Sequence, residues 1–322
     1  MSPEVCVVIP TRNRCDILAR TLRTVLWQED VDLQVVVVDE GSSDATPAML
    51  RAVRDPRLLV LRHDQPQGVA KARNAGIARC TAPWVAFLDD DDLWAPRKLR
   101  AQLDALHQDG EAAWSCTGSV RVYGEQLRVG AAEPVPGRRD IADVLLHNNV
   151  IPGGASSVLA STELVRAVGG FDPRLSNLAD WDLWTRLGLR SPLVSVPHAL
   201  VGYYTHVGSM AGDVGSALRD LDVVEDKYAA ERAERGVRLS VENMLWYLAG
   251  LQLRAGRPWT AARLHLRLVP YGRPAVHALR HAVLGLVWPG LQAFRDRREE
   301  RNSSQAWRAE ADAWLAALRG PA

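Results

Sequence analysis

The 322-residue chain lacks several features that mark common protein classes. Its four cysteines, at positions 6, 15, 80 and 116, form no C-x-x-C pair, so neither a zinc site nor a disulfide framework is indicated. The formal net charge is only +1, from which we expect no nucleic-acid partner. No apolar run approaches the roughly 18 residues of a membrane span. We therefore expect a soluble or peripherally attached protein in a reduced, cytoplasmic setting.

Glycine-rich phosphate signatures are also missing. The G-x-G-x-x-G of dinucleotide oxidoreductases is absent, and residues 10–14, directly after the first apolar run, contain no glycine. A sugar nucleotidyltransferase is expected to carry a Gly-rich loop at that place, so this class is a weaker alternative.

The dominant feature that is present is a run of four carboxylates: Asp89, Asp90, Asp91 and Asp92. It follows an apolar segment, residues 84–88, that is bounded by Pro83 and typical of a buried parallel strand. Adjacent carboxylates repel one another, and a hard divalent ion with oxygen ligands, Mg²⁺ or Mn²⁺, commonly balances them. The alternative is a solvated acidic turn that caps the helix starting near Pro96.

The order of the expected elements predicts an α/β fold. Short apolar runs at residues 5–9, 33–38, 58–61 and 84–88 alternate with helical patterns, which is typical of βαβ units on a parallel sheet. Ligands of such sheets bind outside the carboxyl ends of the strands. We therefore expect one binding rim, built from residues 11–14, 39–44, 68–74 and 89–92.

Beyond residue 110 the alternation ends. Irregular strands and turns lead to a helix near residues 178–187 whose first turn carries two acids, and two further strands precede residue 206. After about residue 212 the pattern is helical, with a terminal helix at 302–322 that we expect to be loosely tethered. Apolar residues 279–291 are flanked by arginines, so this part either packs as a helical extension or lies on a membrane surface.

Several short motifs follow one another in order. They are V-I-P-T-R-N-R at residues 8–14, V-V-D-E-G-S-S-D at 37–44, F-L-D-D-D-D-L-W at 87–94, G-G-F-D at 169–172 and D-W-D-L-W at 180–184, followed by His206. Through these motifs, residues 5–210 resemble the family 2 glycosyltransferases of the GT-A fold. The resemblance implies a Rossmann-like, mostly parallel sheet flanked by helices, with a C-terminal helical extension.

The resemblance also implies a function. It is the transfer of a sugar, with inversion, from a nucleotide-diphosphate donor of the UDP or dTDP type to a hydroxyl of a glycan, lipid-linked, peptide or small-molecule acceptor. Residues 1–212 would form the glycosyltransferase domain, with a nucleotide-sugar half at 1–110 and an acceptor half at 111–212. Residues 213–322 would be the extension.

Carried over residue by residue, the resemblance implies a nucleotide-sugar site formed by Pro10, Thr11, Asn13, Asp39, Gly68, Arg73, Asp89 and Asp90. Asp39 would accept an N–H of the base, and Arg73 would pair with the diphosphate. The metal, Mn²⁺ or Mg²⁺, would be held by Asp91, Asp89 and His206. The general base would be Asp180.

Two departures from the family pattern leave alternatives open. The family commonly has Glu directly before the base, where this chain has Ala179, so Asp180 and Asp182 are both candidates for the base. An acid at the middle position of D-x-D leaves two registers for the metal ligand. From another functional class, a non-catalytic nucleotide-sugar-binding or scaffold protein is the alternative that the gap at Ala179 favours.

Overall fold

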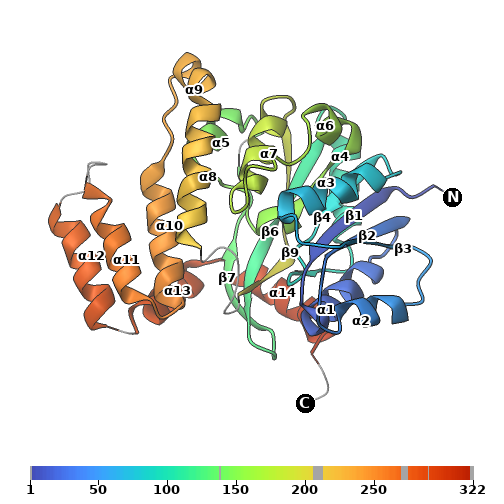
Figure 1. Cartoon of the computed structure of the whole chain (residues 1–322), viewed down its shortest axis with the longest axis horizontal. Helices are drawn as coiled ribbons and strands as arrows, with labels where there is room; N and C mark the ends of the chain where they lie inside the picture. The colour runs from blue at the N-terminus through green and yellow to red at the C-terminus, as the bar shows by residue number, and fades with distance from the viewer. Residues whose placement is uncertain (1, 138, 206–212, 270–274, 289, 320–322) are drawn as a thin grey trace.

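The structure is a computed structural model, and it describes residues 2–137, 139–205, 213–269, 275–288 and 290–319 (Figure 1). Within these residues a nine-stranded sheet has the order β3-β2-β1-β4-β8-β6-β9-β5, with β7 paired to β6. The pairings give β1, β2, β3, β4, β6 and β9 one direction, and β5, β7 and β8 the other. The expected mostly parallel α/β sheet is confirmed.

The first half of the sheet follows the expected βαβ order. Its strands are β1 (Val5–Thr11), β2 (Leu33–Glu40), β3 (Leu58–His63) and β4 (Trp84–Phe87). The helices between them are α1 (Cys15–Leu26), α2 (Thr46–Ala52) and α3 (Val69–Arg79). Parallel register places Thr11 opposite Asp39, and Asp39 opposite Arg62, at the carboxyl end of the sheet.

The second half mixes directions. Its strands are β5 (Leu93–Trp94), β6 (Trp114–Tyr123), β7 (Arg128–Glu133), β8 (Val158–Ser161) and β9 (Leu193–Thr205). They are accompanied by α4 (Lys98–Asp109), α5 (Ala142–His147), a 3₁₀ turn (Gly154–Ser157), α6 (Thr162–Ala167) and α7 (Ala179–Gly188). Because β8 is antiparallel to β4, the 3₁₀ turn that enters β8 lies at the same rim as the end of β4.

Both faces of the sheet are covered, which explains the continuous apolar strands. Odd residues of β1, such as Val7, pack in one core with α1 and α4, whereas even residues, such as Val8, pack in another with α3 and α7. Successive side chains of a strand point to opposite faces, so a strand buried on both sides has no polar alternation.

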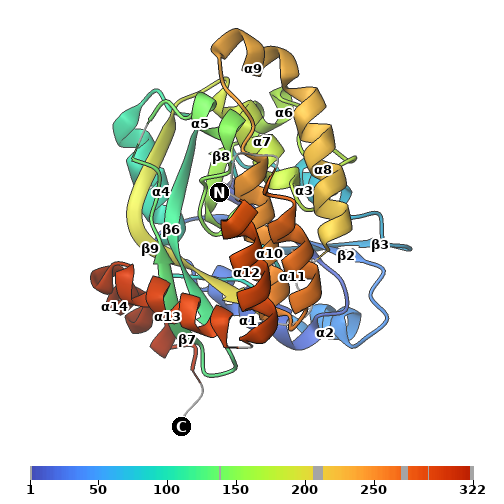
Figure 2. The same cartoon turned by 90° about the vertical axis from the view of Figure 1, so that its left-hand side faces the viewer.

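All elements described after residue 213 are helices. They are α8 (Val214–Lys227), α9 (Ala229–Arg235), α10 (Val241–Arg254), α11 (Pro258–Leu266), α12 (Ala275–Val287), α13 (Leu291–Asn302) and α14 (Gln305–Ala316). Helices α10, α11 and α12 stand side by side at one end of the molecule's long axis (Figures 1 and 2). None of the helices in the described ranges is long and apolar enough to cross a membrane.

The expectation of a loosely tethered terminal helix is wrong. Helix α14 returns to the sheet and packs on β7 and β9, as Figure 2 shows. Trp307 lies so close to Gly118 that a Cβ there would be 2.0 Å from its ring, and the Trp314 indole donates to the Ala199 carbonyl at 3.0 Å. The apolar positions of α14 therefore complete a core of the sheet domain, and the division at residue 212 stays a proposal.

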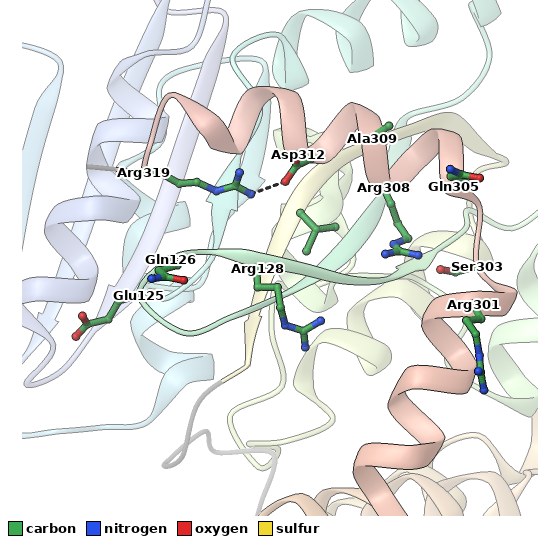
Figure 3. Close-up of a pocket in the computed structure, with 11 residues that line it drawn as sticks. Glu125, Gln126, Arg128, Arg301, Ser303, Gln305, Arg308, Ala309, Asp312 and Arg319 are labelled. Carbon is green, nitrogen blue, oxygen red and sulfur yellow. Dashed lines mark hydrogen bonds and ion pairs between the residues drawn. The ribbon is translucent and has the colours of Figure 1, made fainter. Parts of the chain in front are cut away.

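An open pocket lies where α13 and α14 meet the β6–β7 hairpin (Figure 3). Its arginines are Arg128, Arg301, Arg308 and Arg319. Arg319 pairs with Asp312 at 2.5 Å and Arg128 with Glu300 at 2.8 Å. None of the residues expected at the binding rim lines this pocket.

Candidate active site

The four aspartates after β4 occupy four different environments. Asp89 pairs with Arg73 from α3, and Asp90 accepts a hydrogen bond from the Thr11 hydroxyl at 2.7 Å. Asp91 pairs with Arg14 at 2.7 Å. Asp92 is fully buried, 2.5 Å from the Ser156 hydroxyl, and also accepts the Tyr204 N–H at 3.0 Å. The run is thus not a solvated turn, because each carboxylate has its own partner from another part of the chain.

Two of these aspartates carry less negative charge than free carboxylates do. Burial, followed by the charge of Asp91, raises the pKa of Asp90 to about 7, although Arg14 and Thr11 oppose the rise. Burial also raises the pKa of Asp92 well above its ordinary value, with Asp91 and Asp89 adding to the effect. Asp89 and Asp91 are therefore the members of the run best suited to hold a cation at neutral pH.

The donor set fits a divalent ion in part. The side chains of Asp89 and Asp91 are 31% and 16% exposed, so both reach the rim surface. Carboxylate oxygens suit Mg²⁺ and Mn²⁺, which usually keep several waters and bind substrate phosphates beside one or two carboxylates. No group of three or more metal-ligating side chains is found in the described ranges, and the third expected ligand, His206, lies outside them.

Asp39 is positioned at the end of β2 as expected. It is only 1% exposed, accepts the Ser42 N–H at 2.9 Å, and pairs with Arg62, which also donates to the Ser42 carbonyl. A small cavity of about 180 Å³ beside it is lined by Asp39, Pro47, Leu50, Arg51, Val60 and Arg62. The lining thus combines three apolar side chains, two arginines and one fixed carboxylate. Apolar side chains suit the faces of a nucleobase, and the carboxylate suits an N–H at its edge.

The loop after β1 is joined to the loop after β2. Asn13 has a positive φ of 54°, and its side-chain oxygen accepts the Ser43 N–H at 2.8 Å, while its own N–H donates to the Ser42 hydroxyl at 2.8 Å. Pro10, opposite Val38, is buried within β1. Asn13 therefore fixes the loop after β1 against the loop that follows Asp39, and Thr11 lies opposite Asp39 in the sheet.

Helix α3 brings Arg73 to the rim. The Gly68 N–H, at the start of the helix, donates to Glu40 at 2.9 Å, and the positive φ of Gly68, 96°, makes the turn. Arg73 is 5% exposed, stacks 5.0 Å from the centroid of the Phe171 ring, and pairs with Asp89. Its buried Nε has no hydrogen-bond partner among the described residues. A guanidinium fixed at the rim in this way suits an anionic ligand, with which it can pair through its terminal N–H groups.

The two base candidates, Asp180 and Asp182, are separated by the helix. Asp180, half-buried in the first turn of α7, has its Oδ2 3.6 Å from where a Cβ on Gly154 would lie. Burial raises the pKa of Asp180, Arg73 lowers it and Asp89 raises it, so this carboxylate shares the rim with both.

Asp182 points into the protein instead. It is completely buried, and its carboxylate meets Arg186 at 2.5 Å, Lys227 at 2.7 Å and the Tyr228 hydroxyl at 2.7 Å. With cations and a donor on both oxygens, it ties α7 to α8 and α9. Its environment is that of a structural ion pair, away from the rim that Asp180 shares.

Two contributions from the extension were not foreseen from the sequence. Asp220 of α8 is 4% exposed and uses one oxygen to accept the N–H groups of Ser176, Asn177 and Leu178 at 2.8, 2.7 and 3.0 Å. These donors directly precede α7, so Asp220 caps the helix that carries Asp180. Tyr247 on α10 is 50% exposed overall, yet the pKa of its hydroxyl is raised by desolvation, then by the charges of Glu133 and Asp180, so α10 borders the site.

We expect Asp220→Ala to reduce both stability and turnover, because one buried and two half-buried N–H groups lose their acceptor. Each donor left unpaired lowers the free energy of unfolding by up to about 3 kcal/mol. Without its cap, the first turn of α7 is less well fixed, so Asp180 can move out of position. Thermal unfolding and the turnover of a transfer assay measure the two effects. Asp222→Ala, two residues on and exposed, is the matched control and should change neither. Full turnover in Asp220→Ala would contradict a positioning role.

Comparison with known proteins gives matches over the sheet domain. Residues 6–157 match the family model described as Glycosyl transferase family 2. The succinoglycan biosynthesis protein ExoO of Rhizobium meliloti is 41% identical over 128 residues, which are 39% of this chain and 37% of that protein. The chain thus spans little more than a third of that relative. A PGL/p-HBAD biosynthesis glycosyltransferase of Mycobacterium tuberculosis is 27% identical over 216 residues, 66% of this chain and 81% of the relative.

Solved structures show the same fold at low sequence identity. Staphylococcus aureus TarS 1–349 in complex with UDP-GlcNAc has a TM-score of 0.59 and 16% identity, covering 98% of this chain and 92% of that one. The mannosyltransferase PcManGT of Pyrobaculum calidifontis, in complex with GDP-Man and Mn²⁺, has a TM-score of 0.51 and 20% identity, covering 97% and 87%. These likenesses extend beyond residue 212 into the helical part of the chain.

Proposed function

The chain belongs to glycosyl transferase family 2 through residues 6–157, and from this premise we propose that it is an inverting glycosyltransferase. It moves a sugar from a nucleotide-diphosphate donor, of the UDP or dTDP type, to an acceptor hydroxyl. The observation that carries the proposal is the meeting of Asp39, Arg73, Asp89 and Asp180 at one rim, from four separate segments of the chain.

The donor is held from its base to its diphosphate along this rim. The base enters the cavity beside Asp39, whose carboxylate accepts a base N–H, with Pro10, Thr11 and Asn13 as the adjoining wall. Arg73, which reaches the rim where it pairs with Asp89, pairs with the diphosphate there. Gly68 allows the turn that starts α3, and Asp90 holds Thr11 in place.

Asp180 is the general base of the reaction. It removes the proton from the acceptor hydroxyl as that oxygen bonds to the anomeric carbon and the bond from this carbon to the diphosphate oxygen breaks. Attack from the face opposite the leaving group inverts the anomeric centre. A divalent ion held by Asp91 and Asp89 would neutralise charge on the departing diphosphate. Arg73 supplies positive charge at the same place and needs no ion to do so.

The surroundings of the enzyme follow from the same proposal. Nucleotide sugars are small anionic molecules, so the protein needs a donor-accessible compartment, for which we propose the cytoplasm, at or near the inner face of the membrane. The acceptor, whether a glycan, a lipid-linked sugar, a peptide or a small molecule, meets the acceptor half at residues 111–212 and the extension that borders it.

A donor screen tests the proposed function. Each nucleotide sugar that binds should raise the melting temperature by mass action, and the true donor should also be hydrolysed slowly without an acceptor. UDP-, dTDP- and GDP-sugars are compared with Mn²⁺ present. Stabilisation without hydrolysis or transfer would favour the non-catalytic binding protein, and a lack of stabilisation by all of them would refute the proposal.

Asp39→Ala should weaken donor binding, and the loss should be the same whichever sugar the nucleotide carries. The base N–H then loses a buried acceptor, which costs on the order of 1–3 kcal/mol of binding free energy. Titration calorimetry with the free nucleoside diphosphate measures this loss. Asp64→Ala is the matched control, since it removes an exposed carboxylate near the same sheet end that does not line this cavity, and it should leave the affinity unchanged. Unchanged affinity in Asp39→Ala would place the base elsewhere.

A further inference from the structure

Helices α10, α11 and α12 pack tightly on their inner faces. The Trp246 ring of α10 meets the rings of His265 at 4.6 Å and His281 at 4.7 Å, both edge to face. Small residues let the backbones approach, since a Cβ on Gly285 would lie 3.2 Å from Leu253. These helices therefore form a built layer, and the apolar residues left on its outer face are not needed to hold it together.

The outer face of α12 is an apolar stripe. Val276, Leu279, Val283 and Val287 are 77%, 56%, 45% and 70% exposed, and they recur every three or four residues, so they lie on one side of the helix. On the neighbouring α11, Trp259 is 71% and Leu266 is 47% exposed. Single exposed apolar residues are ordinary, but a stripe on adjoining helices indicates a docking surface.

The charge around this stripe is of one sign. Residues 243–295 contain no Asp or Glu, although the chain as a whole has 38 acidic residues against 39 basic ones. Arg263 of α11, Arg267 directly after that helix and Arg280 of α12 are exposed beside the stripe. Arg257, just before α11, is exposed as well. A nearly neutral protein has thus gathered positive charge and apolar surface at one end, which is the left-hand end in Figure 1.

We propose that the outer face of α11 and α12 docks on an anionic lipid bilayer. Helices with exposed Leu, Val and Trp on one side and arginines beside them lie in the interface, apolar side chains among the acyl chains and guanidiniums at the phosphates. Anionic lipid supplies the complementary charge. A second copy of this chain is disfavoured, because it would bring the same arginines against each other. Docking by this face leaves α10 and the rim it borders at the membrane side of the enzyme.

Vesicle co-sedimentation tests the proposal with the full chain. Much of the protein should sediment with phosphatidylcholine vesicles that contain phosphatidylglycerol. Much less of it should sediment with vesicles of pure phosphatidylcholine. Arg263→Gln/Arg267→Gln/Arg280→Gln should weaken binding roughly 100-fold, at about fivefold per arginine. Leu279→Gln/Val283→Gln should weaken it at least about tenfold. The matched control, Arg54→Gln/Arg79→Gln/Arg190→Gln, removes three exposed arginines from the sheet domain and should bind as the parent does.

Three results would overturn the proposal. They are equal binding to both kinds of vesicle, equal binding by the stripe variants and the parent, and a concentration-dependent dimer in light scattering that the stripe variants abolish. Thermal unfolding of each variant shows that α10 to α12 stay folded. No substrate is used, so sedimentation succeeds or fails separately from the proposed sugar transfer.

Discussion

Asp180→Asn is expected to lower the turnover of sugar transfer about 10²–10⁴-fold, the usual effect of losing a general base. The amide cannot take the acceptor proton, but it can still accept the Trp181 N–H that the carboxylate accepts at 2.7 Å. Fold and donor affinity should therefore stay close to those of the parent. Turnover with a saturating acceptor, donor affinity by calorimetry and thermal unfolding separate these effects.

The pH dependence provides a second measurement of the same residue. Burial raises the pKa of Asp180 above the ordinary value of a free Asp, which is about 3.9. A base is active only when ionised, so turnover should fall as the pH drops through this raised pKa. Asp180→Asn should lose that acid limb of the pH–rate profile along with the rate.

Asp182→Asn is the matched control, two residues on in the same helix. It leaves Arg186 without its charge partner and Lys227 with Asp172 alone, and breaking an ion pair of a fully buried carboxylate costs up to about 3–5 kcal/mol. We therefore expect a lower melting temperature and retained turnover in the folded fraction. Loss of turnover with an unchanged melting temperature would instead identify Asp182 as the base.

Asp91→Asn is expected to remove the metal dependence of donor binding. In the parent, EDTA should weaken the binding of a nucleoside diphosphate, because the proposal has Asp91 and Asp89 hold an ion that would also attract the phosphates. Substituting a residue that only hydrogen-bonds to a metal ligand typically lowers metal affinity 10–100-fold. Removing a ligand itself should therefore lower metal affinity by at least about as much. Calorimetry with Mn²⁺ and with EDTA should then give equally weak binding for the variant.

Arg14→Gln separates the ion from the salt bridge. Arg14 pairs with Asp91 at 2.7 Å, so both substitutions break this pair, but only Asp91→Asn removes a proposed metal ligand. Arg14→Gln should keep the effect of EDTA, whereas Asp91→Asn should not. Equal affinity of the parent with Mn²⁺ and EDTA would remove the ion from the proposal. If Asp89→Asn loses the EDTA effect and Asp91→Asn keeps it, the ligand register is shifted.

Local patterns determined much of this architecture. Apolar runs and helical periods predict the strands and helices of the first half correctly, because burial on both faces of a parallel sheet leaves a direct imprint on the chain. Parallel order then places Thr11, Asp39 and Asp89 at one rim, since the carboxyl ends of such strands share an edge. The helical character after residue 212 is predicted by the same periodicity.

Only the tertiary structure decided the environment of each aspartate in the two acidic motifs. Asp89, Asp90, Asp91 and Asp92 look alike in sequence, yet their partners Arg73, Thr11, Arg14 and Ser156 come from 16 to 79 residues away. Asp180 and Asp182 lie in one motif, and only the packing of Lys227 and Tyr228 buries one of them. Periodicity reports whether a side chain faces inward, but its partner depends on which distant segments the fold brings together. The cap from Asp220 and the return of α14 to the sheet are long-range contacts of this kind, so no local pattern revealed them.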